Sequence, residues 1–576
     1  MQKLKKQIIL LLSLMLGITL LFTSCKSDET DNPTPQQQQE FSENFGSSVN
    51  RDFMGKIVDE SNLPINGVLV SIGGNSYTTD VNGIFIIDNA SVHEKFAYIT
   101  AKKTGYLMGS RSLVPTDGVN KVKIMLLAEN LAGTVASGSD SEVSLANGTI
   151  VKFDGSFVDE NGNDYSGSVD VFVHHLASSD SDINSKMPGM LYAQNENNDE
   201  RMLETYGMIN VELRGGGSKL NIAEGHKAII ELPIDVSQAN APNTIDLWHF
   251  DEVKGYWIQD GSATKQGNKY VGEVSHFSWW NCDAPFPTVT LCLNITDNAN
   301  VPLANIRVDL STNTISPRVG FTDGNGNVCG LIPSNEVLNV TIYDICNNAI
   351  YTTTIGPFSA DTNESISLSG GAGESVVVSG NLLDCSNANV VNGYVLFEYG
   401  NSQVVTLVTN GLFEFSTLVC SGNNAFTIEG IDISNAESSG ILYQTFTVPT
   451  TDLGNVFACG STISEYISYQ INNEAPQAFF NPGANVSGSY ISMYEEANNG
   501  YITIQGNSPI VGVYNTPDFD LSGIDVDYNV ATDIQFTLSN VGAVGEYIDL
   551  TFVGTYTSTD GNVKNITGTV HVLRDY

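Results

Sequence analysis

The sequence predicts an all-β protein made of several tandem β-sandwich modules. Short runs in which apolar and polar residues alternate, such as 68–72 and 394–397, indicate half-buried strands. Asn-Gly, Asp-Gly and Gly-Gly pairs separate these runs and favour tight turns, and long helical periodicity is absent after residue 24. Because 576 residues exceed what one hydrophobic core usually supports, we expect several sandwiches rather than one.

The amino terminus has the composition of a secretory signal. Lysines precede an apolar run of about fifteen residues, which is shorter than the roughly 20 residues of a membrane-spanning helix. The run ends at Ser24 and Cys25, and residues 21–25 resemble the lipobox of bacterial lipoproteins. The resemblance implies a signal peptide over 1–24, cleavage between Ser24 and Cys25, and a lipid on Cys25 that attaches the chain to a membrane.

Residues 25–50 are predicted to form a disordered tether. They are polar and rich in Gln, Asn and Pro, so they cannot build a hydrophobic core. Lys26, Asp28 and Glu29 follow the cysteine and resemble the export signal of Bacteroidetes lipoproteins that face the cell exterior. We therefore expect a lipid-anchored protein on the outer face of the outer membrane.

An internal repeat follows the tether. Each copy has a strand, a turn and a second strand, then a Thr-Asp-x-x-Gly turn at Gly83, at Gly326 and, in shortened form, at Gly411. Glycine can adopt the positive φ that such a turn needs. The repeat resembles the carboxypeptidase regulatory-like domain, a transthyretin-like β-sandwich. The family is named for a non-catalytic appendage of metallocarboxypeptidases, so the resemblance implies sandwiches at 51–127, 286–370 and, divergently, 371–460, but no peptidase activity.

The segment between the first two copies has a different resemblance. Residues 128–285 resemble the extracellular region of cartilage intermediate layer protein, and the resemblance is carried by five segments: 154–169, 205–209, 247–251, 255–257 and 275–283. The resemblance implies an extracellular structural or interaction module and transfers no active-site residue. Residues 461–576 continue the strand pattern, and we expect there a C-terminal β-module of unknown type.

The chain is strongly acidic. The chain has 64 Asp and Glu against 25 Lys and Arg, a formal net charge of −39, and no Lys or Arg lies between Arg318 and Lys564. Such a surface repels nucleic acid and anionic lipid, so we expect no nucleic-acid partner. A diffuse binding of divalent cations is the alternative to a simply solvated acidic face.

No catalytic residue, cofactor or metal site is predicted. The seven histidines form no His-Glu-x-x-His motif, and His174 and His175 are neighbours in a predicted strand, so they point to opposite faces. No nucleophile elbow, Walker loop or dinucleotide fingerprint occurs, although two converging carboxylates of a glycoside hydrolase remain an alternative. Residues 159–164 and 323–327 are rich in oxygen ligands, but Asn-Gly sequences favour turns over calcium loops.

The aromatic residues Trp248, Tyr256, Trp257, Trp279 and Trp280 include all four tryptophans of the chain. Such side chains can stack on sugar rings or anchor an interface, but in strands they more often fill a core. Exposure decides between these interpretations.

Seven cysteines follow Cys25, and secretion makes disulfides plausible for them. The odd number leaves at least one thiol free or paired with another molecule, and sequence order does not determine the pairing. Within the repeats we expect Cys329 to pair with Cys346 and Cys385 with Cys420.

Two functions fit these features. The first is a non-catalytic surface protein for adhesion or structure, with a protein or matrix partner. The alternative is a glycan-binding accessory lipoprotein of a polysaccharide-uptake system, which requires exposed aromatic side chains.

Overall fold

The computed structural model describes residues 40–576 apart from 239, 314, 369–373, 401, 421–423, 460, 463–464, 473–476, 481 and 498–499. The predicted signal peptide, the cleavage site at Ser24 and Cys25, and the export residues Lys26, Asp28 and Glu29 lie outside the described residues. Residues 41–576 form one compact unit. Among the described residues, no helix is long and apolar enough to cross a membrane.

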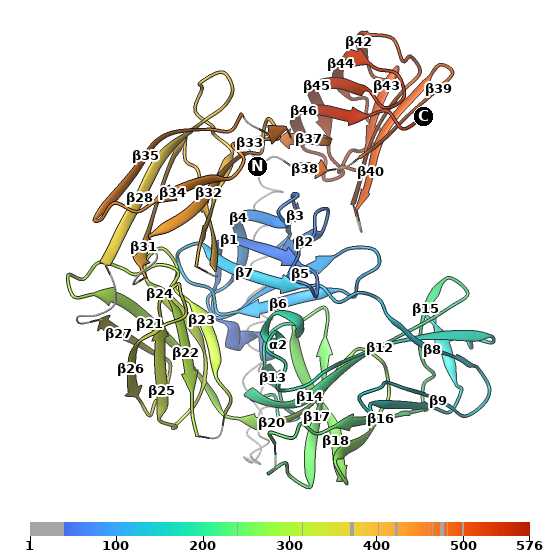
Figure 1. The fold of residues 1–576 in the computed structure, drawn as a ribbon. Helices are drawn as coiled ribbons and strands as arrows, with labels where there is room; N and C mark the ends of the chain where they lie inside the picture. Colours follow the sequence, from blue (N-terminus) through green and yellow to red (C-terminus); the bar gives the residue numbers. More distant parts are fainter. Residues whose placement is uncertain are drawn as a thin grey trace, which may run out of the picture. The chain divides into compact units, whose positions relative to one another are not determined.

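The predicted fold class is confirmed. Nearly all regular structure among the described residues is β-strand, arranged in several separate sheets (Figure 1). The two short helices that the structure assigns there are the 3-10 helix η1 (Phe41–Phe45) and the single turn α2 (Ile183–Lys186).

The first sandwich (48–127) has two sheets, with strand orders β4-β1-β7 and β3-β2-β5-β6. Its strands are β1 (Ser48–Val58), β2 (Leu69–Ile72), β3 (Asn75–Thr78), β4 (Ile84–His93), β5 (Ala97–Lys102), β6 (Gly109–Leu113) and β7 (Asn120–Met125). The central strand β1 pairs antiparallel with β4 and parallel with β7.

The large-sheet module (128–285) contains a sheet of thirteen strands, in which β11-β15-β14-β20-β17-β18-β19-β16-β10-β9 form the main path. Its strands are β8 (Leu131–Ala136), β9 (Ser141–Ser144), β10 (Ile150–Phe153), β11 (Phe157–Asp159), β12 (Ser168–Leu176), β13 (Tyr192–Gln194), β14 (Glu200–Gly215), β15 (Ser218–Ile222), β16 (Ala228–Pro233), β17 (Thr244–Asp251), β18 (Tyr256–Gln266), β19 (Lys269–Val274) and β20 (Trp279–Phe286).

The second sandwich (286–370) repeats the topology of the first, with sheets β24-β21-β27 and β23-β22-β25-β26 and a parallel pair β21 and β27. Its strands are β21 (Thr288–Asp297), β22 (Arg307–Ser311), β23 (Arg318–Phe321), β24 (Asn327–Pro333), β25 (Leu338–Tyr343), β26 (Ala349–Ile355) and β27 (Thr362–Leu368).

The third sandwich (371–460) has the same central pattern, β31-β28-β35, and a second sheet that contains β30-β29-β32. Its strands are β28 (Glu374–Leu383), β29 (Gly393–Tyr399), β30 (Ser402–Leu407), β31 (Leu412–Val419), β32 (Ala425–Asp432), β33 (Glu437–Ser438), β34 (Leu442–Thr445) and β35 (Thr450–Phe457), with β36 (Ser461–Thr462) added at the edge.

The C-terminal sandwich (461–576) packs a six-stranded sheet, β38-β37-β46-β45-β44-β42, over a four-stranded sheet, β39-β40-β41-β43, around a shared core. Its strands are β37 (Tyr466–Ile471), β38 (Gln477–Phe480), β39 (Gly483–Ser487), β40 (Tyr490–Ala497), β41 (Gly500–Gly506), β42 (Gly512–Asn515), β43 (Phe519–Ser522), β44 (Asp533–Val541), β45 (Tyr547–Thr557) and β46 (Val563–Leu573).

The Thr-Asp-x-x-Gly turn has the same hydrogen bonds in the first two sandwiches. Thr79 Oγ1 donates to Ile65 O (2.7 Å), and Thr322 Oγ1 donates to Leu303 O (2.6 Å). The carboxylate that follows each threonine accepts two backbone N–H groups, at the second and fourth residues after it. The turn chemistry inferred from the repeat is thus visible as an Asx-type turn that closes each sandwich.

The glycine of this turn is required by its surroundings in all three copies. Gly83, Gly326 and Gly411 have φ of 71°, 75° and 86°. A Cβ atom would lie 2.4 to 2.5 Å from an oxygen of the neighbouring strand at each position. The carbonyl oxygens of these glycines accept hydrogen bonds from the central strand, so the same turn is fastened to the same strand three times.

The predicted tether ends earlier than residue 50. Phe41 and Phe45 of η1 are 4% and 6% exposed and pack with Phe96, Tyr192 and Tyr256 in one aromatic cluster. The rings of Phe41 and Phe45 pack between the first sandwich and the large-sheet module. The polar composition of the segment gives no sign of this packing. The tether prediction is therefore wrong for residues 41–50.

The first sandwich also contacts the third sandwich, which follows it by about 300 residues. Tyr394 Oη donates to a carboxylate oxygen of Asp80, and Asn82 Nδ2 donates to Tyr394 Oη (3.1 Å). Leu396 and Ile431 of the third sandwich share a core with the first. Because burial dominates, the pKa of Asp80 is raised to about 6 in spite of its hydrogen bonds.

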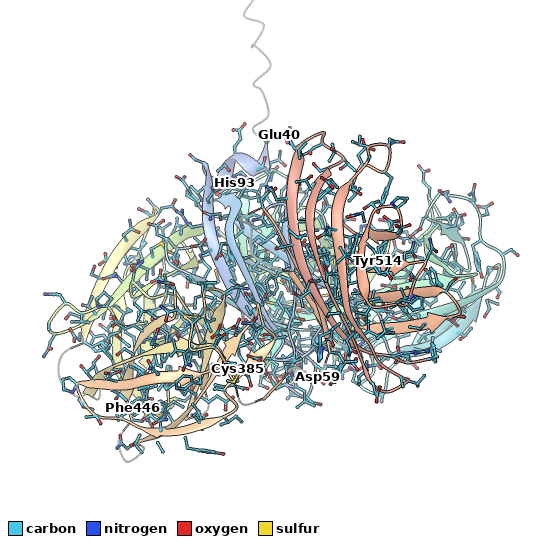
Figure 2. The ribbon with its side chains drawn as sticks, turned by 90° about the horizontal axis from the view of Figure 1, so that it is seen from above. Glu40, Asp59, His93, Cys385, Phe446 and Tyr514 are labelled. Atoms are coloured by element: carbon cyan, nitrogen blue, oxygen red, sulfur yellow. A yellow bond between two sulfur atoms is a disulfide. The ribbon has the colours of Figure 1, made fainter. Side chains whose placement is uncertain are left out.

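The disulfide pairs differ from those expected. Cys292 pairs with Cys329, Cys346 with Cys420, and Cys385, which Figure 2 labels, with Cys459. The expected pairs Cys329 with Cys346 and Cys385 with Cys420 are wrong, because pairing follows strand register and the docking of sandwiches rather than order in the chain. Cys282 is free and buried, and burial raises the pKa of its thiol.

Candidate functional site

The five aromatic residues singled out from the sequence are all buried and do not form one cluster. Trp248, Trp257 and Trp279 pack in one core with Leu107 and Leu127 of the first sandwich. Trp280 lies in the main core of the large-sheet module, and Tyr256 joins the aromatic cluster around Phe41. Trp279 and Trp280 are neighbours on β20 and point to opposite faces, as strand geometry requires.

The exposure of these rings decides between the two interpretations of the aromatic residues. Trp248, Trp257 and Trp280 are 0% exposed, Trp279 is 2% and Tyr256 is 5%. Rings without solvent-facing area cannot stack on a sugar. The ligand-stacking role considered for Trp248, Tyr256, Trp257, Trp279 and Trp280 is therefore wrong, and these side chains fill cores.

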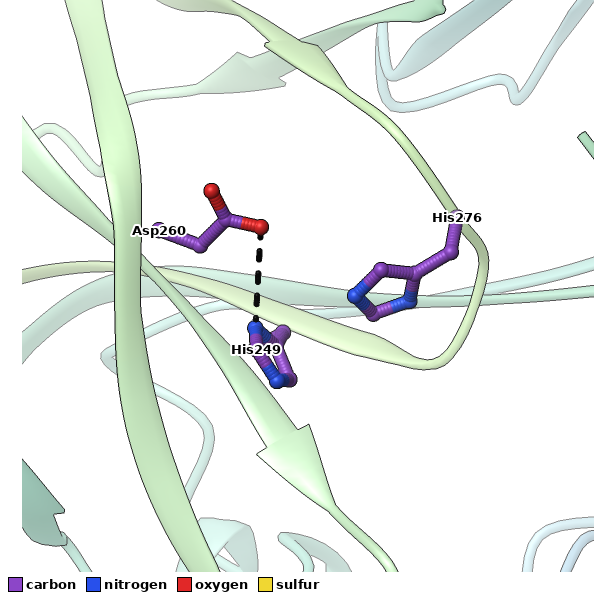
Figure 3. A group of neighbouring side chains, drawn as sticks. All are labelled: His249, Asp260 and His276. Atoms are coloured by element: carbon purple, nitrogen blue, oxygen red, sulfur yellow. Dashed lines mark ion pairs between the residues drawn. The ribbon is translucent and has the colours of Figure 1, made fainter. Parts of the chain in front are cut away.

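Beside Trp280 the large-sheet module brings together three side chains that can bind a metal. His249, Asp260 and His276 each direct one ligating atom into a common space, with these atoms all within 4.8 Å of one another. His249 Nδ1 lies 3.8 Å from Asp260 Oδ2, and the two imidazole rings meet edge to face at 4.7 Å between centroids. Figure 3 shows the three side chains converging from three parts of the chain.

Strand register places His249 and Asp260 on one face. His249 of β17 is opposite Ile258 of β18, and Asp260 follows Ile258 by two residues, so it points to the same side. A bulge in the pairing of β17 and β18 lies next to this position. Bulges re-aim side chains and often lie beside functional sites.

His276 belongs to the turn that joins β19 to β20. Trp280 Nε1 donates to His276 O (2.9 Å), and Phe277 N donates to Asn221 Oδ1 (2.8 Å). The Trp280 ring lies 5.1 Å from the His276 ring and 5.6 Å from the His249 ring. These contacts hold the turn and the imidazole of His276 in place above the sheet.

Burial controls the protonation of this cluster. It lowers the pKa of His249 to about 4, helped by the neighbouring His276, and it also lowers the pKa of His276. Both imidazoles are therefore neutral at neutral pH. His249 Nδ1 is buried and makes no hydrogen bond.

Other potential ligands are already committed to other partners. In the group formed by Asp344, Cys346 and Cys420, the two cysteines are joined in a disulfide. His174 forms a hydrogen bond with Ala128 O, and His175 forms one with the side-chain amide of Asn147.

The two oxygen-rich segments considered for calcium form turns. Asp159 Oδ1 accepts the N–H groups of Asn161 and Asn163, each at 2.9 Å. Asp323 Oδ1 accepts those of Asn325 and Asn327, each at 2.8 Å. These carboxylates therefore have a structural role as turn formers.

A second exposed feature lies on the C-terminal sandwich. Tyr490, Tyr494 and Tyr501 are 40%, 42% and 50% exposed, on the outer face of the sheet β39-β40-β41-β43. The residues between them in the register, Thr503 and Gln505, are polar, and Tyr490 Oη donates to Gln505 Oε1 (2.7 Å). We call this outer face the tyrosine face.

Sequence reasoning missed both features. The ligands of the histidine cluster are 11 and 16 residues apart on two strands and a turn, a spacing that matches no metal motif. The one available signal was that His249 and His276 flank the same hairpin, which β18 and β19 form. The three tyrosines could not be told apart from the other 20 tyrosines of the chain, because alternation alone does not tell which face of a strand meets solvent.

Comparison with known proteins identifies one curated relative. Cartilage intermediate layer protein 2 of mouse is 25% identical over 203 residues, which are 33% of this chain and 17% of that protein. The chain thus covers less than one fifth of the relative's length. No family model matches the chain.

Comparison with solved structures returns pilins and the Bacillus anthracis TIE protein at low identity. A streptococcal ancillary pilin is 11% identical, with 38% of this chain and 94% of that chain covered and a TM-score of 0.13. The major pilin subunit BcpA of Bacillus cereus is 8% identical, with 71% and 98% covered and a TM-score of 0.12. The Bacillus anthracis TIE protein is 8% identical, with 79% and 71% covered and a TM-score of 0.15. TM-scores of this size establish no shared arrangement, so the fold rests on the sheets of this chain itself.

Proposed function

We propose that this chain is a lipid-anchored, surface-displayed, non-catalytic interaction protein of the bacterial outer membrane, with an adhesive or structural role. The observation that carries the proposal is the set of three disulfides, of which Cys346–Cys420 joins two different sandwiches. Disulfides persist in oxidising compartments outside the cytosol. A covalent link between two sandwiches also restricts their movement relative to each other, which suits a structural or adhesive protein. The lipobox-like sequence at Cys25 and the likeness to cartilage intermediate layer protein 2 of mouse support the same proposal.

The tyrosine face supplies a surface for the partner. Tyrosine is enriched in binding surfaces, because it combines a large apolar ring with a hydroxyl group that can form hydrogen bonds. Three such rings on one exposed sheet face, separated by Thr503 and Gln505, form a surface that can contact a protein or a saccharide. The same face is the specific observation that favours the second candidate function, a glycan-binding accessory lipoprotein.

Lipid attachment is expected at Cys25. Cells that express the full chain with labelled palmitate should yield labelled protein, and Cys25→Ala should carry no label. Full incorporation into the Cys25→Ala variant would contradict the proposal. Surface display needs a separate test with a broad-specificity protease on intact cells, because trypsin has no site between Arg318 and Lys564.

Binding through the tyrosine face is tested by two assays on the same variants. We expect Tyr494→Ala combined with Tyr501→Ala to lose at least tenfold in affinity, because each exposed ring contributes a large share of a small interface. The assays are a glycan array and a pull-down from cell envelopes, with Tyr443→Ala as the matched control, since Tyr443 is 83% exposed on another sandwich.

The result also separates the two candidate functions. A specific envelope protein that is retained by the wild type and released by the double variant supports the first candidate. A saccharide with that behaviour supports the second. If every ligand binds the double variant as well as it binds the control, the tyrosine face is not the binding surface.

A further inference from the structure

We infer that His249, Asp260 and His276 form a binding site for a divalent transition-metal ion, for which zinc is the expected occupant. This inference concerns the large-sheet module and does not depend on the proposed adhesive function. It rests on the spacing of the ligating atoms, on an unpartnered buried nitrogen and on the chemistry of the three donors.

The spacing suits a single ion. Zinc binds imidazole nitrogen at about 2.0–2.1 Å and carboxylate oxygen at about 2.0–2.2 Å, so two ligands of a tetrahedral ion lie roughly 3.4 Å apart. His249 Nδ1 and Asp260 Oδ2 are 3.8 Å apart, and each of the three side chains has one ligating atom within 4.8 Å of a ligating atom of the other two. Binding of one ion would therefore require these three atoms to move closer together by rotation of their side chains.

The nitrogen of His249 provides the second observation. His249 Nδ1 has almost no contact with solvent and makes no hydrogen bond. A buried polar atom without a partner costs about 1–3 kcal/mol of folding free energy, so such atoms are rare in folded proteins. An ion placed between the three side chains would satisfy this nitrogen, because Asp260 Oδ2, at 3.8 Å, lies beyond hydrogen-bond distance from it.

The donor set selects the class of ion. Two imidazoles and one carboxylate suit zinc and neighbouring first-row ions, whereas calcium and magnesium prefer oxygen ligands only. Three protein ligands leave a position for water, and the Asp260 side chain is 47% exposed, so an ion can enter from solvent. The acidic surface of the chain raises the local concentration of cations.

Neighbouring lysines do not take the place of the ion. Lys254 Nζ lies 3.2 Å from Asp251 Oδ2, and Lys227 Nζ lies 2.8 Å from Glu273 Oε2. Each of these ammonium groups therefore has another carboxylate as its partner.

The ion would join three parts of the module. β17 carries His249, β18 carries Asp260, and the turn before β20 carries His276. A metal ion at this position would clip the β19–β20 turn to the sheet beside the bulge, so its expected role is structural.

The experiment measures zinc binding to the full chain by isothermal titration calorimetry at neutral pH. The buffer contains excess calcium, which occupies diffuse acidic sites on the surface. It leaves the histidine cluster open to zinc, because calcium does not compete well for imidazole. We expect one zinc ion per chain with micromolar or tighter affinity, and at least a tenfold loss with Asp260→Asn or with His276→Asn. The side chain of Asp260 is about half exposed, so its conservative variant is expected to fold.

The matched control is His226→Asn, which removes a histidine of the same module that has a carboxylate neighbour, Asp154, at 2.6 Å but belongs to no three-ligand group in the described structure. This variant should bind zinc like the wild type. As a second readout, copper(II) should quench the fluorescence of Trp280, whose ring lies within 5.6 Å of both imidazoles. Absence of zinc binding at submillimolar concentration, or equal binding by the wild type and both site variants, would overturn the inference.

Discussion

Replacing Trp257 with alanine is expected to lower the free energy of unfolding of the module by about 3–5 kcal/mol. Trp257 is 0% exposed and packs in the core that the large-sheet module shares with Leu107 and Leu127 of the first sandwich. Removing a buried indole loses its transfer free energy and leaves a cavity that surrounding strands cannot fill. Urea unfolding followed by the circular dichroism of the full chain measures the change.

The conservative variant Trp257→Phe separates packing from polarity. Trp257 Nε1 is buried and has no hydrogen-bond partner, so phenylalanine removes an unsatisfied donor while it keeps most of the apolar volume. We expect this variant to lose about 1 kcal/mol or less. If Trp257→Ala were as stable as the wild type and instead lost saccharide binding, the core assignment of this ring would be wrong.

Removing the disulfide between Cys346 and Cys420 is expected to cost about 4 kcal/mol and to uncouple the second and third sandwiches. The two cysteines are 74 residues apart. Closing a loop of that length lowers the conformational entropy of the unfolded chain, which stabilises the folded state by about 4 kcal/mol. The disulfide also joins two cores that exchange side chains. Ile345 lies in the core of the third sandwich, and Leu418 lies in the core of the second.

Cys385–Cys459 offers a matched comparison, since it also spans 74 residues but lies within the third sandwich. The variants are Cys346→Ala with Cys420→Ala, and Cys385→Ala with Cys459→Ala, studied by calorimetry. Both should lose similar stability, because the loop lengths are equal. Only the first should split the unfolding of the two sandwiches into separate transitions. A split in the second variant and not in the first would contradict the assigned role of Cys346–Cys420.

The strand pattern and the local turns could be predicted because they depend on neighbours in the sequence. The alternation in 68–72 and 394–397 reflects the two faces of a strand, and these segments form β2 and β29. Asp80 and Asp323 accept backbone N–H groups two and four residues later, so this part of the repeated motif contained its own structural reason. Thr79 and Thr322 instead donate to Ile65 O and Leu303 O, 14 and 19 residues earlier in the chain.

The errors concern contacts between distant segments. The cysteine pairs depend on how the sandwiches dock, and each cysteine had several partners of similar distance along the chain. Phe41 and Phe45 lie in a polar segment, and their burial needs Tyr192 and Tyr256, which follow about 150 and 210 residues later.

The sequence by itself determined that this chain is all-β, modular and strongly acidic, because composition and short-range alternation are sufficient for those properties. Only the tertiary structure decided which side chains meet. It buried all four tryptophans, left the tyrosine face exposed, and brought His249, Asp260 and His276 together from two strands and a turn. The physical reason is that strand register, bulges and docking between sandwiches set these distances, and none of them is written in the spacing of residues along the chain.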